Sequence, residues 1–154
     1  MAEVDLSAQL TLIVRIVVGF VLGAVLGAER ESRAKPAGLR THMLVAGGSA
    51  AFTVAALALF SDDGAARVVA QIITGIGFLG AGAILRTGAH ARESGGEVVG
   101  MTTAATVWVA AALGMLAGGG VYLLAVASTL LALFALRLPH KWLRSQDGNA
   151  DEDD

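Results

Sequence analysis

Five apolar runs, separated by short polar segments, constrain this chain more than any other feature of its sequence. The runs extend from about Leu10 to Ala28, Leu44 to Phe60, Val68 to Leu85, Met101 to Leu116 and Val121 to Leu138. Hydrophobic residues make up 55% of the 154 residues and charged residues only 16%, whereas soluble domains carry about 25% charged residues. Runs approaching 20 apolar residues are typical of membrane-spanning helices. The sequence therefore predicts an all-α integral membrane protein, a bundle of five transmembrane helices.

Lys and Arg residues are distributed unevenly over the segments that flank the runs. Nine of the eleven fall in 29–42, in 86–100 and at the C-terminal end from Arg137 onward, all on the same side of a membrane crossed five times. The opposite side has only Arg67, and Arg15 lies within the first run. Since cytoplasmic loops collect Lys and Arg, we expect the N-terminus outside and the C-terminus in the cytoplasm.

Small residues recur at four-residue spacing along three of the runs, which places them on one face of each helix. Lipid provides no hydrophobic drive between helices, so such faces become the contact surfaces of a membrane bundle. The sequence therefore predicts tight packing. The three faces are Gly19, Gly23 and Gly27; Gly47, Ala51 and Ala55; and Ala110, Gly114 and Gly118.

The third run contains the stretch GIGFLGAGAIL, with glycines at Gly75, Gly77, Gly80 and Gly82. Each interior glycine costs a helix about 1 kcal/mol relative to alanine, so the stretch requires a reason. One interpretation is a bent or broken helix at a functional site, as in transporters. The other is a very close helix crossing, for example at a dimer interface.

A few polar residues inside the runs are candidates for function. Arg15 is the only full charge within a run, and an intramembrane charge is a functional candidate by default. Alternatively, its side chain extends outward toward Asp62 or Asp63. Gln71 and Thr74 share one face of the third run.

The segment ERESRAKPAGLRTH (29–42) concentrates charge between two apolar runs. Pro36 and Gly38 favour a turn, which we expect to bring Glu29 toward Arg40 at the membrane surface. The alternative is a solvated charge cluster that only sets the topology. At the start of the fourth run, the hydroxyls of 102–106 are expected to cap the helix.

Several classes of chemistry lack the residues that they require. The sequence has no cysteine, which excludes disulfides, thiolate metal sites and cysteine nucleophiles. None of the apolar runs contains a carboxylate, and the three histidines lack the spacing of metal ligands. The net charge of −2 argues against nucleic acid as a partner. We expect no enzyme activity and no cofactor, and these residues give no support for direct Mg²⁺ binding.

Three blocks of the sequence are specific enough to resemble a known family. They read GAERESRAKPAGLRTHMLVAGGSAAF (27–52), GIGFLGAGAILRTG (75–88) and GMTTAATVWVAAALGMLAGGGVY (100–122). In this order and spacing they resemble the membrane domain of the MgtC/SapB family, over nearly the whole chain up to about Pro139. The resemblance implies a five-span protein of the bacterial inner membrane, associated with adaptation to low magnesium and, in pathogens, with survival inside host cells. The best-known members look like regulators that bind other membrane proteins, including the proton-translocating ATP synthase.

The resemblance also implies signature positions and two departures from the family pattern. Val99 stands where many members have a basic residue. Many members carry a soluble C-terminal domain, whose function we expect to be missing because the chain ends soon after the fifth run. Residues 141–154 are acidic and are predicted to form a disordered tail after a membrane domain over 1–140. The signature positions are Glu29, Arg30, Lys35, Gly38, Arg40, Thr41, Gly77, Gly80, Gly82, Arg86, Thr103 and Trp108.

Two functions follow as expectations. The first is a non-enzymatic membrane regulator, a homodimer whose glycine faces dock against partner proteins. The second is a small-ion or solute transporter or channel, built as a homodimer around the glycine-rich third run. The candidate functional residues are Arg15, Glu29, Arg30, Lys35, Arg40, Thr41, Gln71, Thr74, Arg86 and Thr103.

Overall fold

The computed structural model describes residues 5–91 and 100–138, apart from the side chains of 86–91. Within these ranges the chain forms five helices and no strand. Four of them are long and apolar enough to cross a membrane, and the fifth is a shorter apolar helix. The predicted all-α membrane bundle is confirmed, whereas its orientation stays a prediction. The helices are α1 (Leu6–Ser32), α2 (Leu39–Leu59), α3 (Asp62–Ala91), α4 (Met101–Gly118) and α5 (Tyr122–Arg137).

The helices extend beyond the apolar runs at several ends. α1 continues through the charged residues 29–32, because Glu and Arg are good helix formers and nothing before Pro36 breaks the helix. α2 already begins at Leu39, and α3 continues to Ala91. Charged residues that the hydropathy pattern assigns to loops therefore lie on helical turns, where their spacing determines which side chains meet.

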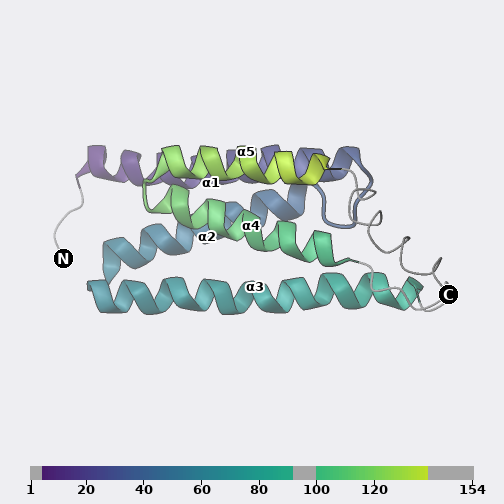
Figure 1. Cartoon of the computed structure of the whole chain (residues 1–154). Helices are drawn as coiled ribbons and strands as arrows, with labels where there is room; N and C mark the ends of the chain where they lie inside the picture. Colours follow the sequence, from purple (N-terminus) through teal and green to yellow (C-terminus); the bar gives the residue numbers. More distant parts are fainter. Residues whose placement is uncertain (1–4, 92–99, 139–154) are drawn as a thin grey trace, which may run out of the picture.

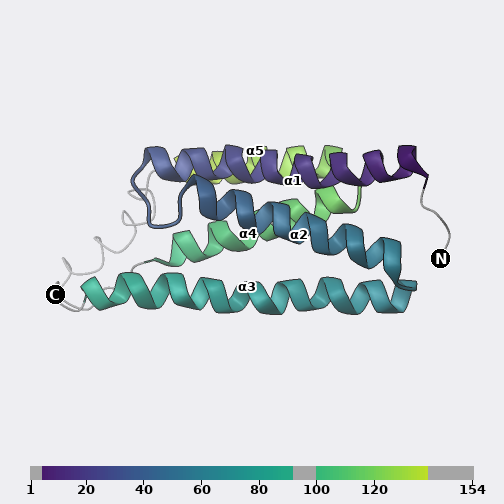
Figure 2. The ribbon, with the colours of Figure 1, turned by 180° about the vertical axis from the view of Figure 1, so that it is seen from behind.

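The five helices run along one common axis in three layers (Figures 1 and 2). α1 and α5 form one layer, α2 and α4 the middle one, and α3 lies alone on the opposite side. Among the described residues, α3 contacts only α2 and α4. This arrangement packs α1, α2 and α4 against one another, and it leaves one long side of α3 without a neighbour.

The centre of the bundle is the contact of α2 with glycines from two sides. Ala50 is fully buried between Gly19 of α1 and Gly118 of α4. A Cβ atom added at Gly19 would lie 2.7 Å from the Ala50 Cβ, and one added at Gly118 would lie 2.7 Å from the Ala50 carbonyl oxygen. Both distances are too short for real atoms, so only glycine allows the helices to approach this closely. The same arrangement recurs one turn along α2, where the residues are Gly23, Ala46 and Gly114.

The buried face of α2 differs by one residue from the predicted one. We expected Gly47, Ala51 and Ala55 to face a neighbouring helix, but Ala46 and Ala50 hold the central positions. Of the three predicted residues, Gly47 does face α1, where it provides room for the ring of Phe20. A shift of one residue turns a helix face by about 100°, and only the shape of Phe20 distinguishes the two alternatives.

The glycines of α3 produce neither a break nor a close crossing within the protomer. α3 is one continuous helix, so the expectation of a bent or broken helix is wrong. A Cβ atom added at Gly75, Gly77 or Gly82 would have nothing within 4 Å, and one at Gly80 would lie 3.7 Å from the Ala104 Cβ. The close crossing is therefore also absent at these positions inside one chain.

The helices α4 and α5 form a hairpin that is short in both arms. α4 has 18 residues and α5 has 16, which correspond to about 27 and 24 Å of helix, less than the hydrocarbon thickness of about 30 Å. Gly120 turns the chain with a positive φ of 79°, which favours glycine. The tip of this hairpin stops short of the α1 N-terminal end (Figure 1).

We predict that Gly23→Ala destabilises the bundle by about 1–3 kcal/mol, because the added methyl group collides with His42 and Ala46. The matched control is Gly48→Ala, where a Cβ has nothing within 4 Å. This control should be neutral or stabilising by up to about 1 kcal/mol, since alanine is the better helix former. Unfolding in SDS, followed by circular dichroism, measures both. Equal effects of the two substitutions would contradict the packing described here.

Candidate functional site

The charged segment between α1 and α2 forms the candidate functional site. The chain leaves α1 through a C-terminal turn of Schellman type. The Ala34 N–H donates to the Glu31 carbonyl at 2.9 Å, and the Lys35 N–H donates to the Arg30 carbonyl at 3.1 Å. Ala34 has a positive φ of 52°, a conformation that glycine adopts more easily. The turn therefore reverses the chain within a few residues and brings the start of α2 against the end of α1.

Glu31 joins the two helices at this turn. Its Oε2 accepts a hydrogen bond from the Leu39 N–H at 2.7 Å, so a carboxylate from α1 caps the N-terminus of α2, where negative charge is favoured. A Cβ added at Gly38 would lie 2.8 Å from that same oxygen. The small residue at position 38 thus allows the carboxylate to reach the helix end. This role of Glu31 was not predicted from the sequence, although an acidic helix end followed by the Gly-Leu start of α2 is a pattern that could have indicated it.

Glu29 pairs with two arginines of its own helix. The distance from Glu29 Oε1 to Arg33 Nε is 2.5 Å, and that from Oε2 to Arg30 Nη1 is 3.5 Å. The Glu29 and Arg30 side chains are only 11% and 4% exposed, whereas Arg33 is 47% exposed. The predicted partner, Arg40, is exposed and makes no ion pair with Glu29. That prediction is wrong because the i,i+4 spacing on α1 brings Arg33 closer than the chain reversal brings Arg40.

His42 completes the buried polar group from the side of α2. Its side chain is fully buried, and its Nδ1 lies 2.9 Å from the Gly38 carbonyl. Because a carbonyl only accepts, Nδ1 carries the proton in this contact. Gly27 of α1 lets α2 approach here, since an added Cβ would lie 3.0 Å from the His42 Cβ. The glycine spacing on α1 is therefore the reason that a histidine is buried at this end of the bundle.

These groups form a polar cluster whose hydrogen bonding is incomplete. We define the charged cluster as Glu29, Arg30, Arg33 and His42. Several of its buried atoms have no hydrogen-bond partner among the described residues, namely both Glu29 carboxylate oxygens, Arg30 Nε and His42 Nε2. The Glu29 contacts are thus charge pairs without well-aligned hydrogen bonds. A buried network of this kind is sensitive to any change in its neighbours.

Other predicted site residues surround the charged cluster or lie outside it. Lys35, Arg40 and Thr41 are exposed next to the turn. Thr103 on α4 is buried, with 4% exposure. Arg86 belongs to α3, and its side chain lies outside the described part of the structure, as do residues 92–99 of the predicted 86–100 loop and the predicted tail over 141–154.

The threonines at the start of α4 do not cap it. The N-cap residue is Gly100, which has a positive φ of 101° and makes no side-chain capping bond. Thr106 donates to the Thr103 carbonyl at 2.8 Å, inside the helix. The expected capping role is therefore wrong, because the helix begins before the hydroxyls and a left-handed glycine sets its first turn.

Arg15 binds the end of a helix and not an acidic side chain. Its Nη1 donates to the Gly118 carbonyl at 3.3 Å, and a Cβ added at Gly120 would lie 3.2 Å from its guanidinium carbon. Arg15 thus supplies a cation and a donor to the C-terminus of α4, where both are favoured. No ion pair to Asp62 or Asp63 occurs in the described ranges. Arg15 thus satisfies a backbone carbonyl at a helix end that lies within the apolar bundle.

Gln71 and Thr74 lie far from the charged cluster, on the exposed side of α3. Thr74 donates to the Ala70 carbonyl of its own helix at 3.4 Å.

In chemical terms, the described residues contain no group of three or more His, Asp or Glu side chains that could hold a metal ion. The charged cluster supplies ion pairing and the neighbouring Glu31 supplies helix capping, and together they can position two helices and recognise a polar partner.

The apolar helices and their charged turn define a multi-pass membrane protein. The sequence model of the MgtC family matches residues 16–144, and the chain belongs to this family, as the resemblance implied. The protein named "Putative magnesium transporter YhiD" of Escherichia coli (strain K12) is 37% identical over 137 residues, covering 84% of this chain and 60% of that protein.

Two further relatives carry the name "Protein MgtC". That of Salmonella typhimurium (strain LT2) is 45% identical over 108 residues, covering 70% of this chain and 43% of its own. That of Brucella abortus (strain 2308) is 44% identical over 113 residues, covering 72% of this chain and 44% of its own. The chain thus spans between 43% and 60% of the length of these relatives. No solved structure matches.

We predict that Glu29→Ala lowers the free energy of unfolding by about 3 kcal/mol, because it leaves Arg30 buried without its counter-charge. Glu29→Gln should lose less, since the amide oxygen still accepts a hydrogen bond. The control is the exposed Arg40→Ala, which should change stability by no more than about 0.5 kcal/mol. SDS unfolding measures all three. A loss for Arg40→Ala as large as that for Glu29→Ala would contradict the assigned pairing.

Proposed function

We propose that this chain is a non-enzymatic regulator of the bacterial inner membrane, which acts in adaptation to low magnesium by binding other membrane proteins. Membership of the MgtC family and the name of the YhiD relative support the link to magnesium. The excess of Lys and Arg on one side supports an external N-terminus. On this proposal the charged turn faces the cytoplasm.

The observation that carries the proposal is the closed interior of the protomer. Around Ala46 and Ala50, helices α1, α2 and α4 approach to backbone contact. The buried hydroxyl of Thr53 is occupied by its own helix, since it donates to the Ser49 carbonyl at 2.8 Å. The Arg15 side chain donates a hydrogen bond to the end of α4. In the described part of the protomer, this packing supports binding at outer surfaces over passage of ions through the bundle.

The charged turn is the surface that we propose for a partner protein. Lys35, Arg40 and Thr41 are exposed there, and the two cations favour an acidic partner surface. The charged cluster beneath them holds the turn in one conformation. The ATP synthase, which the family resemblance implies, is the first partner to test.

A transporter or channel is the second candidate function. One relative is named as a putative magnesium transporter, and Gln71 and Thr74 are polar side chains exposed within a candidate span. Two copies facing each other along α3 would place these residues along a shared path. This candidate requires the path to lie between protomers.

The test is Mg²⁺ flux into liposomes that contain the purified protein and an entrapped Mg²⁺-sensitive dye. We expect flux equal to that of protein-free liposomes, because the protomer interior is closed. Flux above this background that is lost in Gln71→Leu would contradict the regulator and establish the second candidate. In parallel, ATP synthase should co-purify with the chain from host membranes and be lost with Arg40→Glu but retained with Arg67→Glu.

A further inference from the structure

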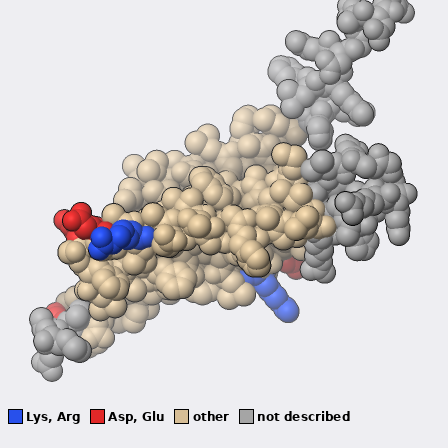
Figure 3. Space-filling view, turned by 90° about the horizontal axis from the view of Figure 1, so that it is seen from below, with Lys and Arg blue, Asp and Glu red and all other residues tan. Residues whose placement is uncertain are grey.

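The helix α3 is far more exposed than the other candidate spans. Only 6% of its most apolar 18-residue window is buried, against 28%, 44% and 50% for α1, α2 and α4. The outward side of α3 has no charged side chain along its middle, and charges gather toward the ends of this face (Figure 3). The residues on this side are therefore set in the bilayer and have no neighbour within the chain.

Small residues recur on the exposed side of α3, interspersed with the larger Ile73, Phe78, Leu79 and Leu85. On the other outer helices, α5 presents large side chains such as Leu123 (86% exposed) and Leu131 (68%), and α1 presents Val14 and Val17. Large aliphatic side chains are thus common where a helix of this protein faces lipid. The exposed small residues of α3 are Ala66, Ala70, Thr74, Gly75, Gly77, Ala81 and Gly82.

Packing within the chain does not explain these glycines. A Cβ atom at Gly75, Gly77 or Gly82 would meet nothing within 4 Å, although glycine weakens a helix relative to alanine. In membranes, small residues allow a second helix to approach closely. The exposed side of α3 therefore allows the same close approach that α1, α2 and α4 make inside the bundle. No helix of the described chain occupies it.

Gln71 gives an independent indication of what that occupant is. Its side-chain amide is exposed on α3, about 13 Å from the helix start, and has no hydrogen-bond partner among the described residues. An amide in hydrocarbon is unfavourable unless it is paired. Because it carries both a donor and an acceptor, the same residue of a second copy can satisfy it. Interhelical glutamine pairs are a known source of association in membranes.

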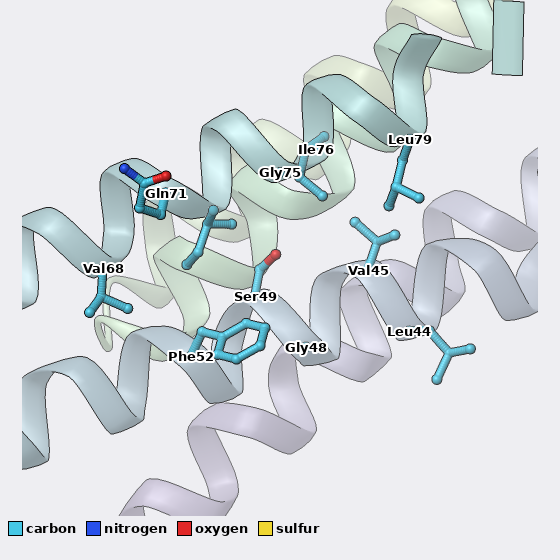
Figure 4. Close-up of a pocket in the computed structure, with 11 residues that line it drawn as sticks. Leu44, Val45, Gly48, Ser49, Phe52, Val68, Gln71, Gly75, Ile76 and Leu79 are labelled. Atoms are coloured by element: carbon cyan, nitrogen blue, oxygen red, sulfur yellow. The ribbon is translucent and has the colours of Figure 1, made fainter. Parts of the chain in front are cut away.

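The surface offers both a groove and an exposed aromatic ring. A groove of about 540 Å³ separates α2 from α3, and Figure 4 shows Leu44 and Phe52 on one side of it and Gly75 and Leu79 on the other. Phe78, which precedes Leu79 in the sequence, is 82% exposed. A two-fold interface pairs the same surface patch of both copies, so that a ring of one copy can enter the groove of the other.

We propose that the exposed side of α3 is a self-association surface, on which Gln71, the glycines Gly75 and Gly82 and the adjoining groove receive the same surface of a second copy in the bilayer. The aromatic ring of Phe78 enters the groove of the partner, and the two Gln71 amides pair across the two-fold axis. The proposal does not rest on the regulatory function, because self-association is measured without reference to activity.

The test is the dimerisation constant of fluorescently labelled protein in liposomes, measured by Förster transfer at increasing dilution in lipid. We expect Gly75→Leu to weaken dimerisation by at least about 10-fold and Gln71→Leu by about 3-fold. The matched control is Ala127→Leu, a small exposed residue on α5, which should leave dimerisation unchanged. Because a side chain at position 75 enters open space, the protomer should retain its stability in SDS unfolding.

Single cysteines provide a second readout, since the sequence contains none of its own. Oxidation with copper phenanthroline should link Gly75→Cys and Gly82→Cys protomers, but not Ala127→Cys protomers. A monomeric wild type, or equal cross-linking at position 127, would overturn the proposal. It would also be overturned if Gly75→Leu released a different membrane protein and left self-association unchanged, because the surface would then belong to that partner.

Discussion

The contact of glycine with backbone around Ala46 and Ala50 is the constraint on which the rest of this structure depends. Without a hydrophobic drive between helices, van der Waals contact at close approach holds a membrane bundle together. Here α1 and α4 both approach α2 at the same two residues. This approach sets the register of three helices at once. It buries His42 against Gly27, and it brings Arg15 of α1 to the end of α4.

The polar groups of the bundle are placed at the ends of helices, where unsatisfied backbone groups need them. Glu31 caps the start of α2 and Arg15 binds the end of α4. Within the described part of the chain, Arg15 Nε and, in the charged cluster, atoms of Glu29, Arg30 and His42 are nevertheless buried without a hydrogen-bond partner. A buried polar network that is only partly satisfied is costly, and a partner that supplied the missing hydrogen bonds at the turn would stabilise it.

The five helices could be predicted because runs of apolar residues have few alternatives in water. The small-residue faces of α1 and α4 were also readable, since Gly19, Gly23 and Gly114 stand among larger neighbours. The face of α2 was not, because residues 46–51 are all Ala, Gly or Ser and every helix face offers small side chains. The partner of Arg15 is a backbone carbonyl, which hydropathy and charge patterns do not encode. The glycines of α3 were the least decidable, because the chain packs almost nothing against them.

The closed interior of the protomer is the central claim, and cysteine accessibility tests it most directly. Ser49 and Thr53 lie on the buried face of α2, where they are 3% and 5% exposed, whereas Arg40 is exposed. A charged, membrane-impermeant thiol reagent, which reacts only with a water-exposed thiolate, should label Arg40→Cys in inverted or right-side-out vesicles. It should not label Ser49→Cys or Thr53→Cys from either side. Labelling of the two buried positions at the rate of position 40 would show that water enters the bundle and would contradict a closed protomer.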